Sequence, residues 1–235
     1  MSDQPEITIR DLTVGYGREP VLHGLSATFP RGRMTAVVGP NGSGKSTLLG
    51  VIAGVLRPAA GSVERATSSS PAFVAQRSAV SDSLPISVRD TVSMGRWAHR
   101  GPWRRLTAQD RAVVEECMAR LELLPLAARR LGSLSGGQRQ RALLAQGLAQ
   151  ESELLLLDEP GAGLDAEARR LITEALENTK ALGTTVVQVT HDFAEAMRAD
   201  HCLVLHDGQL TAAGAPGDVL TPQVLEKVWG IRSLP

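Results

Sequence analysis

The sequence predicts an α/β protein whose core sheet is mainly parallel. Residues 34–38 are mostly apolar, residues 154–157 are four leucines, and residues 185–190 are rich in β-branched side chains. Such runs are typical of strands that are buried on both faces of a sheet. Segments with helical character follow at 48–53 and 166–182. Strands that alternate with helices in this way favour parallel pairing, because a parallel strand returns to its sheet through a long crossover.

Length and composition limit the classes of function. The 235 residues suffice for one large domain with a sizeable core. The formal net charge of +0 gives no general attraction to nucleic acid or to lipid headgroups. No apolar run approaches the roughly 18 residues that span a membrane, and the acidic, polar N-terminus is unlike a signal peptide. We expect a cytosolic protein in which Cys117 and Cys202 are reduced and buried.

A glycine-rich stretch between a predicted strand and a predicted helix carries the first chemical information. Residues 39–47 have the spacing G-x-x-x-x-G-K-[ST], which is typical of a loop that cradles phosphate groups, the P-loop. Glycines let its backbone turn tightly, and the N–H groups at the start of the next helix attract anions. We expect Lys45 to bind the β- and γ-phosphates and Ser46 to bind Mg²⁺. The candidate residues are Gly39, Pro40, Asn41, Gly42, Ser43, Gly44, Lys45, Ser46 and Thr47.

Two polar positions near predicted strand ends have no unique interpretation on their own. Tyr16 is the only tyrosine, and it stands between two glycines ahead of the P-loop. Its ring could stack on a nucleobase or pack on the sheet as a turn aromatic, and the residues alone leave both possibilities open. Gln76 follows a short predicted strand at 72–75, at the start of a segment of different character.

The stretch Leu-Ser-Gly-Gly-Gln at residues 134–138, called here the signature, precedes a predicted helix at 139–149. A serine and two glycines at a helix N-terminus make a second anion-binding corner. An ordinary Ser/Gly helix cap explains the same residues, so the pentapeptide alone does not decide between the two.

Acidic and imidazole side chains are predicted at the ends of two buried strands. Asp158 and Glu159 follow the four leucines, and His191 follows residues 185–190. Two acids at one strand end can have different roles. We expect Asp158 to hold Mg²⁺ through water and Glu159 to polarise an attacking water. His191 is placed to hydrogen-bond a γ-phosphate or that water.

Residues 77–150 are predicted to be mainly helical and more basic, with helices at 86–94 and 107–121, the second capped by Thr107. Between these helices, Trp97 and Trp103 stand among several arginines. Such a mixture occurs in protein–protein contacts and in nucleic-acid binding. A solvated loop whose tryptophans close a local core is the alternative.

The two ends of the chain are expected to be simpler. Residues 7–14 and 25–29 favour strands, and residues 57–61 and 67–71 favour loops. Asp207-Gly208 between apolar stretches predicts a β-hairpin. Residues 214–235 predict one or two short helices and a tail.

Together these motifs resemble the ATP-binding subunits of ABC transporters over about residues 7–230. The P-loop, Gln76, the signature, Asp158-Glu159, Asp165 and His191 occur in the order found in that family. The resemblance implies the P-loop NTPase fold of an ABC ATPase, with a mostly parallel core sheet, an N-terminal antiparallel β part and a helical subdomain. It implies one domain over 1–235, with a β core at 1–76 and 151–220, a helical subdomain at 77–150 and a tail at 221–235.

The resemblance also assigns roles to individual residues. It implies that Tyr16 stacks on adenine, that Glu159 is the catalytic base and that His191 is the switch histidine. Gln76 would sense Mg²⁺ and the attacking water and link the site to the membrane partner. The implied Mg²⁺ ligands are Ser46, Gln76 and Asp158, and the residues implied to act across subunits are Ser135, Gly136, Gly137, Gln138 and Asp165. In this family the signature of one subunit completes the ATP site of another, which implies a head-to-tail homodimer with two ATP molecules.

One departure from the family pattern stands before Asp165. The family usually has a polar Thr-Ser-Ala-like run there, whereas this chain has Gly161-Ala162-Gly163. The lost hydroxyl groups are expected to loosen the coupling between the two ATP sites, while the residues that attack ATP are all present.

The segment 74–97 resembles most the ATPases of zinc and manganese importers, and somewhat less those of importers for iron chelates of the siderophore or cobalamin type. The implied partners are integral membrane permease subunits, which contact residues 77–105, and indirectly a solute-binding protein, with no nucleic acid. The implied location is cytoplasmic, peripheral on the inner face of the cell membrane. A soluble ABC ATPase, such as an iron–sulfur assembly subunit, and a small-molecule kinase are the alternatives.

Overall fold

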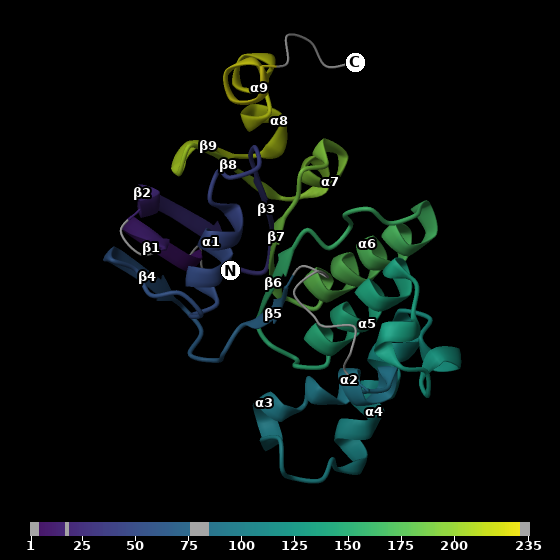
Figure 1. Ribbon diagram of the computed structural model, residues 1–235. Helices are drawn as coiled ribbons and strands as arrows, with labels where there is room; N and C mark the ends of the chain where they lie inside the picture. Colours follow the sequence, from purple (N-terminus) through teal and green to yellow (C-terminus); the bar gives the residue numbers. More distant parts are fainter. Residues whose placement is uncertain (1–4, 17–18, 76–84, 231–235) are drawn as a thin grey trace.

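The computed structural model describes residues 5–16, 19–75 and 85–230 (Figure 1). In these ranges the centre of the molecule is a six-stranded sheet with the order β5-β6-β7-β3-β8-β9. The pairs from β5 to β8 are parallel, whereas β8 and β9 pair antiparallel, so the predicted mainly parallel core sheet is confirmed. The strands are β3 (Met34–Val38), β5 (Ala72–Val74), β6 (Leu154–Asp158), β7 (Thr185–Val189), β8 (His201–His206) and β9 (Gln209–Gly214).

The register of the parallel strands brings their carboxyl ends to one edge of the sheet. Val189 of β7 pairs with Val37 of β3 on one side and with Asp158 of β6 on the other. The residues that follow these three positions therefore emerge side by side, which is where open α/β sheets bind ligands.

A smaller antiparallel sheet, with the order β2-β1-β4, packs over one face of the central sheet together with α1 (Lys45–Ile52). Its strands are β1 (Pro5–Tyr16), β2 (Glu19–Pro30) and β4 (Ala60–Arg65), and Figure 1 shows them beside α1. β1 and β2 are longer than predicted. β4 is not predicted, because this mostly exposed edge strand has no apolar alternation and owes its conformation to pairing with β1.

Helices cover the other face of the central sheet and extend beyond it. Apolar residues of α5 and α6 share one cluster with β5 and β6 and with α2 and α4. Figure 1 shows α2, α3 and α4 at the end of the molecule remote from α8 and α9. The elements are α2 (Val88–Met94), α3 (Trp97–Arg100), α4 (Ala108–Arg120), the 3₁₀ helices η2 (Leu124–Leu126) and η3 (Leu131–Ser133), α5 (Gly136–Leu148) and α6 (Ala166–Ala181).

The predicted cap at Thr107 and the predicted hairpin are confirmed. Thr107 caps α4, and Ser87 caps α2 so that this helix begins two residues later than predicted. Asp207 and Gly208 adopt positive φ angles of 45° and 72° between β8 and β9, as a two-residue hairpin turn requires. The chain continues into α7 (Phe193–Arg198) before the hairpin and into α8 (Pro216–Val219) and α9 (Pro222–Trp229) after it.

Arg96 is buried, so it is not part of the exposed mixture of tryptophan and arginine that the sequence suggests. Its Nε atom donates to Asp110 Oδ1 at 3.1 Å, and its Nη1 atom donates to Ala149 O at 2.8 Å and to Glu151 Oε2 at 2.6 Å. Arg100 Nε also donates to Asp110, at 3.0 Å. These bonds join the start of α4 to the end of α5, so Arg96 and Arg100 serve the fold.

Both cysteines are free and buried, as predicted. Burial raises the pKa of Cys117 to about 11 and that of Cys202 to about 12, so both remain thiols at neutral pH. Within the described ranges, no helix has both the length and the apolar character needed to traverse a lipid bilayer.

We expect Asp110→Asn to destabilise the protein at neutral pH and to matter less in acid. Hydrogen bonds from Thr107 and Arg96, together with the charge of Arg100, hold the pKa of Asp110 well below its usual value of 3.8. A carboxylate whose pKa is lowered by folding stabilises the fold above the usual pKa, and this contribution is lost as the pH falls through the folded-state pKa. The urea midpoints of wild type and variant should therefore differ by a constant amount from pH 7 to about pH 5 and converge below it.

Asp90→Asn is the matched control, because Asp90 has the same place in the cap of α2 but is exposed. Its effect should be small at every pH. A difference for Asp110→Asn that stays constant throughout the acid range would contradict this account of the ion pairs.

Candidate functional site

The P-loop connects β3 to α1 with an open helix N-terminus. Gly42 and Gly44 have φ angles of 82° and 95°, which non-glycine residues rarely adopt. Gly44 is the N-cap of α1 and makes no side-chain cap, so the first N–H groups of this helix remain available to an anion. The Ser43 hydroxyl is buried without a hydrogen-bond partner among the described residues. A polar group of this kind fits a cradle for phosphate oxygens.

Lys45 is buried at the mouth of this loop. Its Nζ atom donates to Gly39 O and Pro40 O, both at 2.8 Å. Burial lowers the pKa of Lys45, and the nearby carboxylates of Glu159 and Asp158 partly oppose that effect. The ammonium group thus stands between the P-loop carbonyls and the acidic strand end, where it can compensate additional negative charge.

Asp158 and Ser46 face each other across the strand ends. Burial raises the pKa of Asp158, and hydrogen bonding with the Ser46 side chain lowers it by less. A hydroxyl and a carboxylate oxygen are hard donors of the kind that Mg²⁺ prefers, so the pair fits the predicted metal ligation. The third predicted ligand, Gln76, lies outside the described residues.

Glu159 and His191 stand beside this pair at the same edge of the sheet. Glu159 has a φ of 51°, and its N–H donates to Val189 O at 3.1 Å, which ties its backbone to the end of β7. His191 Nδ1 lies 3.7 Å from Glu159 Oε1, and the imidazole is 61% exposed. The structure therefore brings together the P-loop, Asp158, Glu159 and His191 in one chain.

The signature forms the start of α5 rather than a loop before it. The predicted helix begins at residue 139, but the observed helix begins at Gly136, because Ser135 and Gln138 form a capping box. Ser135 N donates to Gln138 Oε1 at 3.1 Å, and Gln138 N donates to Ser135 Oγ at 3.3 Å. Each of these two bonds occupies one side-chain oxygen.

The N-terminus of α6 lies against that of α5. A Cβ atom on Gly137 would stand 3.0 Å from the Cβ of Ala168 and 3.9 Å from Asp165 Oδ2. Asp165 caps α6 by accepting a hydrogen bond from Ala168 N at 2.8 Å. Glycine at 137 thus permits the close contact of two capped helices, which places Asp165 next to the signature.

The signature and the P-loop are on different sides of the central sheet within one chain. The apolar residues of α1 belong to the cluster shared with the antiparallel sheet, and those of α5 belong to the cluster on the other face. Figure 1 shows α1 beside β1 and β4, and α5 beside α6. The two predicted phosphate-binding corners therefore do not form one site inside a single copy.

Tyr16 ends β1 with its side chain largely in solvent. The residue is 62% exposed, so its ring is not packed into the core of the sheet. The exposed ring is available for stacking on a nucleobase.

Sequence reasoning missed three polar residues around His191. Thr190 Oγ1 donates to Glu195 Oε2 at 2.7 Å, and Asp192 N donates to Thr190 Oγ1 at 3.1 Å. Asp192 also caps α7. The spacing of an aspartate followed three residues later by a glutamate is a known helix-start pattern, and it could have located α7 and drawn attention to Glu195.

A P-loop between a strand and a helix, an acidic strand end, an adjacent histidine and a capped signature helix define a nucleotide-binding α/β cassette with a helical subdomain. The sequence profile of the family described as ABC transporter matches residues 22–162. The chain belongs to this family, as an ATP-binding subunit with ATPase chemistry.

Curated relatives share identity along almost the whole chain. FepC of Escherichia coli, a ferric enterobactin transport ATP-binding protein, is 37% identical over 234 residues, which cover 95% of this chain and 86% of that protein. MntB of Halalkalibacterium halodurans, a manganese transport system ATP-binding protein, is 34% identical over 231 residues, 96% of this chain and 92% of that protein. HmuV of Thermobifida fusca, a hemin import ATP-binding protein, is 39% identical over 232 residues, which cover 94% of this chain and 80% of that protein.

Solved structures share the fold. An ABC transporter of metal-chelate type in an inward-facing conformation contains a chain that superposes with a TM-score of 0.86 at 32% identity, covering 97% of this chain and 89% of that one. The dimeric structure of MJ0796, a bacterial ABC transporter cassette, gives a TM-score of 0.78 at 26% identity. The match covers 89% of this chain and 98% of that one.

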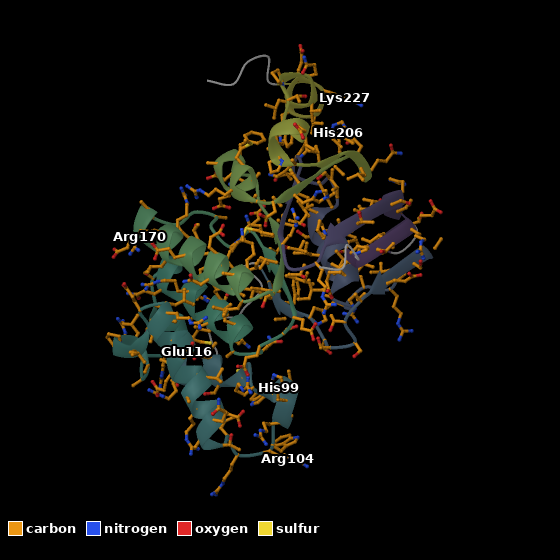
Figure 2. The ribbon with its side chains drawn as sticks, turned by 180° about the vertical axis from the view of Figure 1, so that it is seen from behind. His99, Arg104, Glu116, Arg170, His206 and Lys227 are labelled. Carbon is orange, nitrogen blue, oxygen red and sulfur yellow. The ribbon has the colours of Figure 1, made fainter. Side chains whose placement is uncertain are left out.

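We expect Lys45→Ala to weaken ATP binding by about 10- to 100-fold, because a hydrogen bond to a charged group contributes roughly 1.5–3 kcal/mol. Equilibrium binding of a fluorescent ATP analogue measures the change. Lys227→Ala is the control, since Lys227 lies on α9 at one end of the molecule, outside the P-loop (Figure 2). Binding by Lys45→Ala within twofold of wild type would show that Lys45 does not hold phosphate.

Proposed function

We propose that this chain is the ATP-hydrolysing subunit of an importer that brings a transition metal into the cell, as an ion or as an organic chelate, through a separate membrane permease. The observation that carries the proposal is the joint presence of the P-loop, the acidic strand end and His191 at one sheet edge, in a chain whose relatives are named for manganese, ferric enterobactin and hemin transport. On this proposal the protein is peripheral on the inner face of the cell membrane.

The proposed substrate class includes iron chelates as well as the zinc or manganese ions that the sequence suggests. The sequence predicts zinc or manganese, and of these two MntB supports manganese. FepC and HmuV support an iron chelate at similar identity. The transported metal does not contact this subunit in the proposed arrangement, so side chains of the ATP site carry no information about it.

A second copy of the chain is proposed to complete each ATP site. The P-loop and the signature helix lie on opposite faces of one sheet, so neither copy can bring both to one γ-phosphate. A head-to-tail pair would set Ser135, Gly136, Gly137 and Gln138 of one copy opposite Lys45 of the other. The dimeric structure of the MJ0796 cassette supports this arrangement.

Hydrolysis is proposed to proceed by attack of water on the γ-phosphate. Tyr16 stacks on the adenine ring, and the P-loop N–H groups with Lys45 hold the phosphates. The Glu159 carboxylate accepts the proton of the attacking water, and His191 hydrogen-bonds the γ-phosphate or that water. Ser46, Asp158 and Gln76 would hold Mg²⁺, which would supply positive charge beside the phosphate oxygens.

The surface for the permease is proposed on the tryptophan–arginine loop, residues 97–105. Trp103 is 96% exposed and Trp97 is 42% exposed. Among the described residues, no ion pair or hydrogen bond is recorded for Arg104 or Arg105, and Figure 2 shows Arg104 at the end of the molecule. Arg100 binds Asp110 inside the subdomain, so the proposed contact uses Arg104 and Arg105. Residues 77–84 of the expected surface lie outside the described residues.

We expect Glu159→Gln to bind ATP and to hydrolyse it about 10²–10⁴ times more slowly, because the amide cannot accept the proton of water. Single-turnover hydrolysis of labelled ATP, with size-exclusion chromatography in parallel, should show slow cleavage and an ATP-bound dimer. Glu153→Gln, a surface acid at the other end of β6, is the control. Wild-type turnover by Glu159→Gln would remove Glu159 as the base.

We expect Trp103→Ala combined with Arg104→Ala and Arg105→Ala to abolish stimulation of ATPase activity by the permease that copurifies with the chain, because hot-spot residues cost about 2 kcal/mol or more each. Activity of the chain without permease should be retained. Leu182→Ala, an exposed apolar residue after α6, is the control. Undiminished stimulation would place the permease elsewhere.

Uptake in cells tests the proposed function as a whole. We expect a strain without this chain to lose uptake of one metal, offered as radiolabelled zinc, manganese or an iron chelate, and to recover it with wild type but not with Lys45→Ala. Which metal is lost identifies the substrate. Normal uptake of all three, with the chain absent from purified membranes, would favour a soluble ABC ATPase such as an iron–sulfur assembly subunit. A kinase leaves the signature and His191 without a role.

A further inference from the structure

A carboxylate outside the predicted set lies against the loop that follows Glu159. A Cβ atom on Gly161 would overlap Oε1 of Glu195, and the three atoms nearest to that position all belong to Glu195. Gly161 is not among the residues with a positive φ, so its backbone alone would accept other residues. The Glu195 carboxylate is therefore the group that a side chain at 161 would displace.

The other oxygen of Glu195 reaches the residue before His191. Thr190 Oγ1 donates to Glu195 Oε2 at 2.7 Å and accepts from Asp192 N at 3.1 Å. The Thr190 hydroxyl is thus bonded on both sides, once to α7 and once to the backbone just after His191. This arrangement fixes the backbone that carries the imidazole.

The loop on the Gly161 side carries the proposed catalytic base. Glu159 N donates to Val189 O at 3.1 Å, and Ala162 N donates to Glu159 O at 3.3 Å. Glu159, Gly161, Thr190, His191 and Glu195 line one small cavity of about 40 Å³. Glu195 therefore contacts both of the segments that hold Glu159 and His191.

We propose that Glu195 is a positioning residue for ATP hydrolysis, which sets the loop after Glu159 against the strand end before His191, and that Gly161 is present to admit its carboxylate. On this proposal the departure from a polar residue at 161 does not loosen the site, because Glu195 takes the space of the missing side chain. The proposal rests on the proposed roles of Glu159 and His191.

Steady-state ATP hydrolysis by the full chain tests the proposal, with kcat and KM for ATP measured separately and folding checked by the thermal unfolding midpoint. We expect Glu195→Ala to lower kcat by about 10- to 100-fold with little change in KM, because a misplaced catalytic group loses rate rather than nucleotide affinity. Glu195→Gln, which still accepts the Thr190 hydrogen bond, should retain most of kcat. Thr190→Val should resemble Glu195→Ala, and Thr190→Ser should resemble wild type.

A double-mutant cycle identifies the contact itself. Gly161→Ala should lower kcat when Glu195 is present, because the new methyl group displaces the carboxylate, and should have almost no further effect in the Glu195→Ala background. A purely structural role predicts a fall in the unfolding midpoint that follows kcat.

The Glu159→Gln variant separates a failure of the positioning role of Glu195 from a failure of the proposed function. If Glu159→Gln is inactive but Glu195→Ala keeps kcat within twofold of wild type, or if the two effects in the cycle are additive, the positioning role is wrong and the proposed function stands. If Glu159→Gln is fully active, the proposed base is wrong, and the role of Glu195 fails with it.

Discussion

The parallel pairing of β6, β7 and β3 is the constraint on which the candidate site depends. These strands contribute Asp158 and Glu159, His191, and the P-loop, and their register sets all of these groups at one edge. Side chains that are more than a hundred residues apart in sequence become neighbours because three buried strands have no other low-energy alignment. The helices and the antiparallel sheet cover the two faces of this sheet, and thereby keep the edge as the accessible border.

Most of the central sheet and most of the site could be predicted from the sequence. The runs at β3, β6 and β7 are apolar because both faces are buried, so their strand character is visible locally. The P-loop and the hairpin turn are visible because positive φ angles demand particular residues, as at Gly44 and Gly208. The helix caps at Thr107 and Ser135 are also visible locally, because a cap depends on side chains within four consecutive residues.

What could not be predicted depends on contacts between distant segments. The strand β4 has no pattern of its own and forms only because β1 offers an edge. Arg96 looked like one of several surface arginines, and its burial follows from Asp110 and Ala149, which other helices supply. Glu195 could not be connected to Gly161 from sequence, because this contact requires α7 and the loop after β6 to be placed first. Gln76, the third predicted Mg²⁺ ligand, lies outside the described residues.

The contact between Gly137 and Ala168 has a mechanical consequence. Two helix ends packed this closely, with each cap made by its own side chain, behave as one rigid body. The signature and Asp165 are then expected to move together, and the short segment 160–164 connects them to Glu159. In the proposed dimer, a force applied to the signature by nucleotide bound in the opposite copy would reach the base of the receiving copy through this segment, over a path of a few residues.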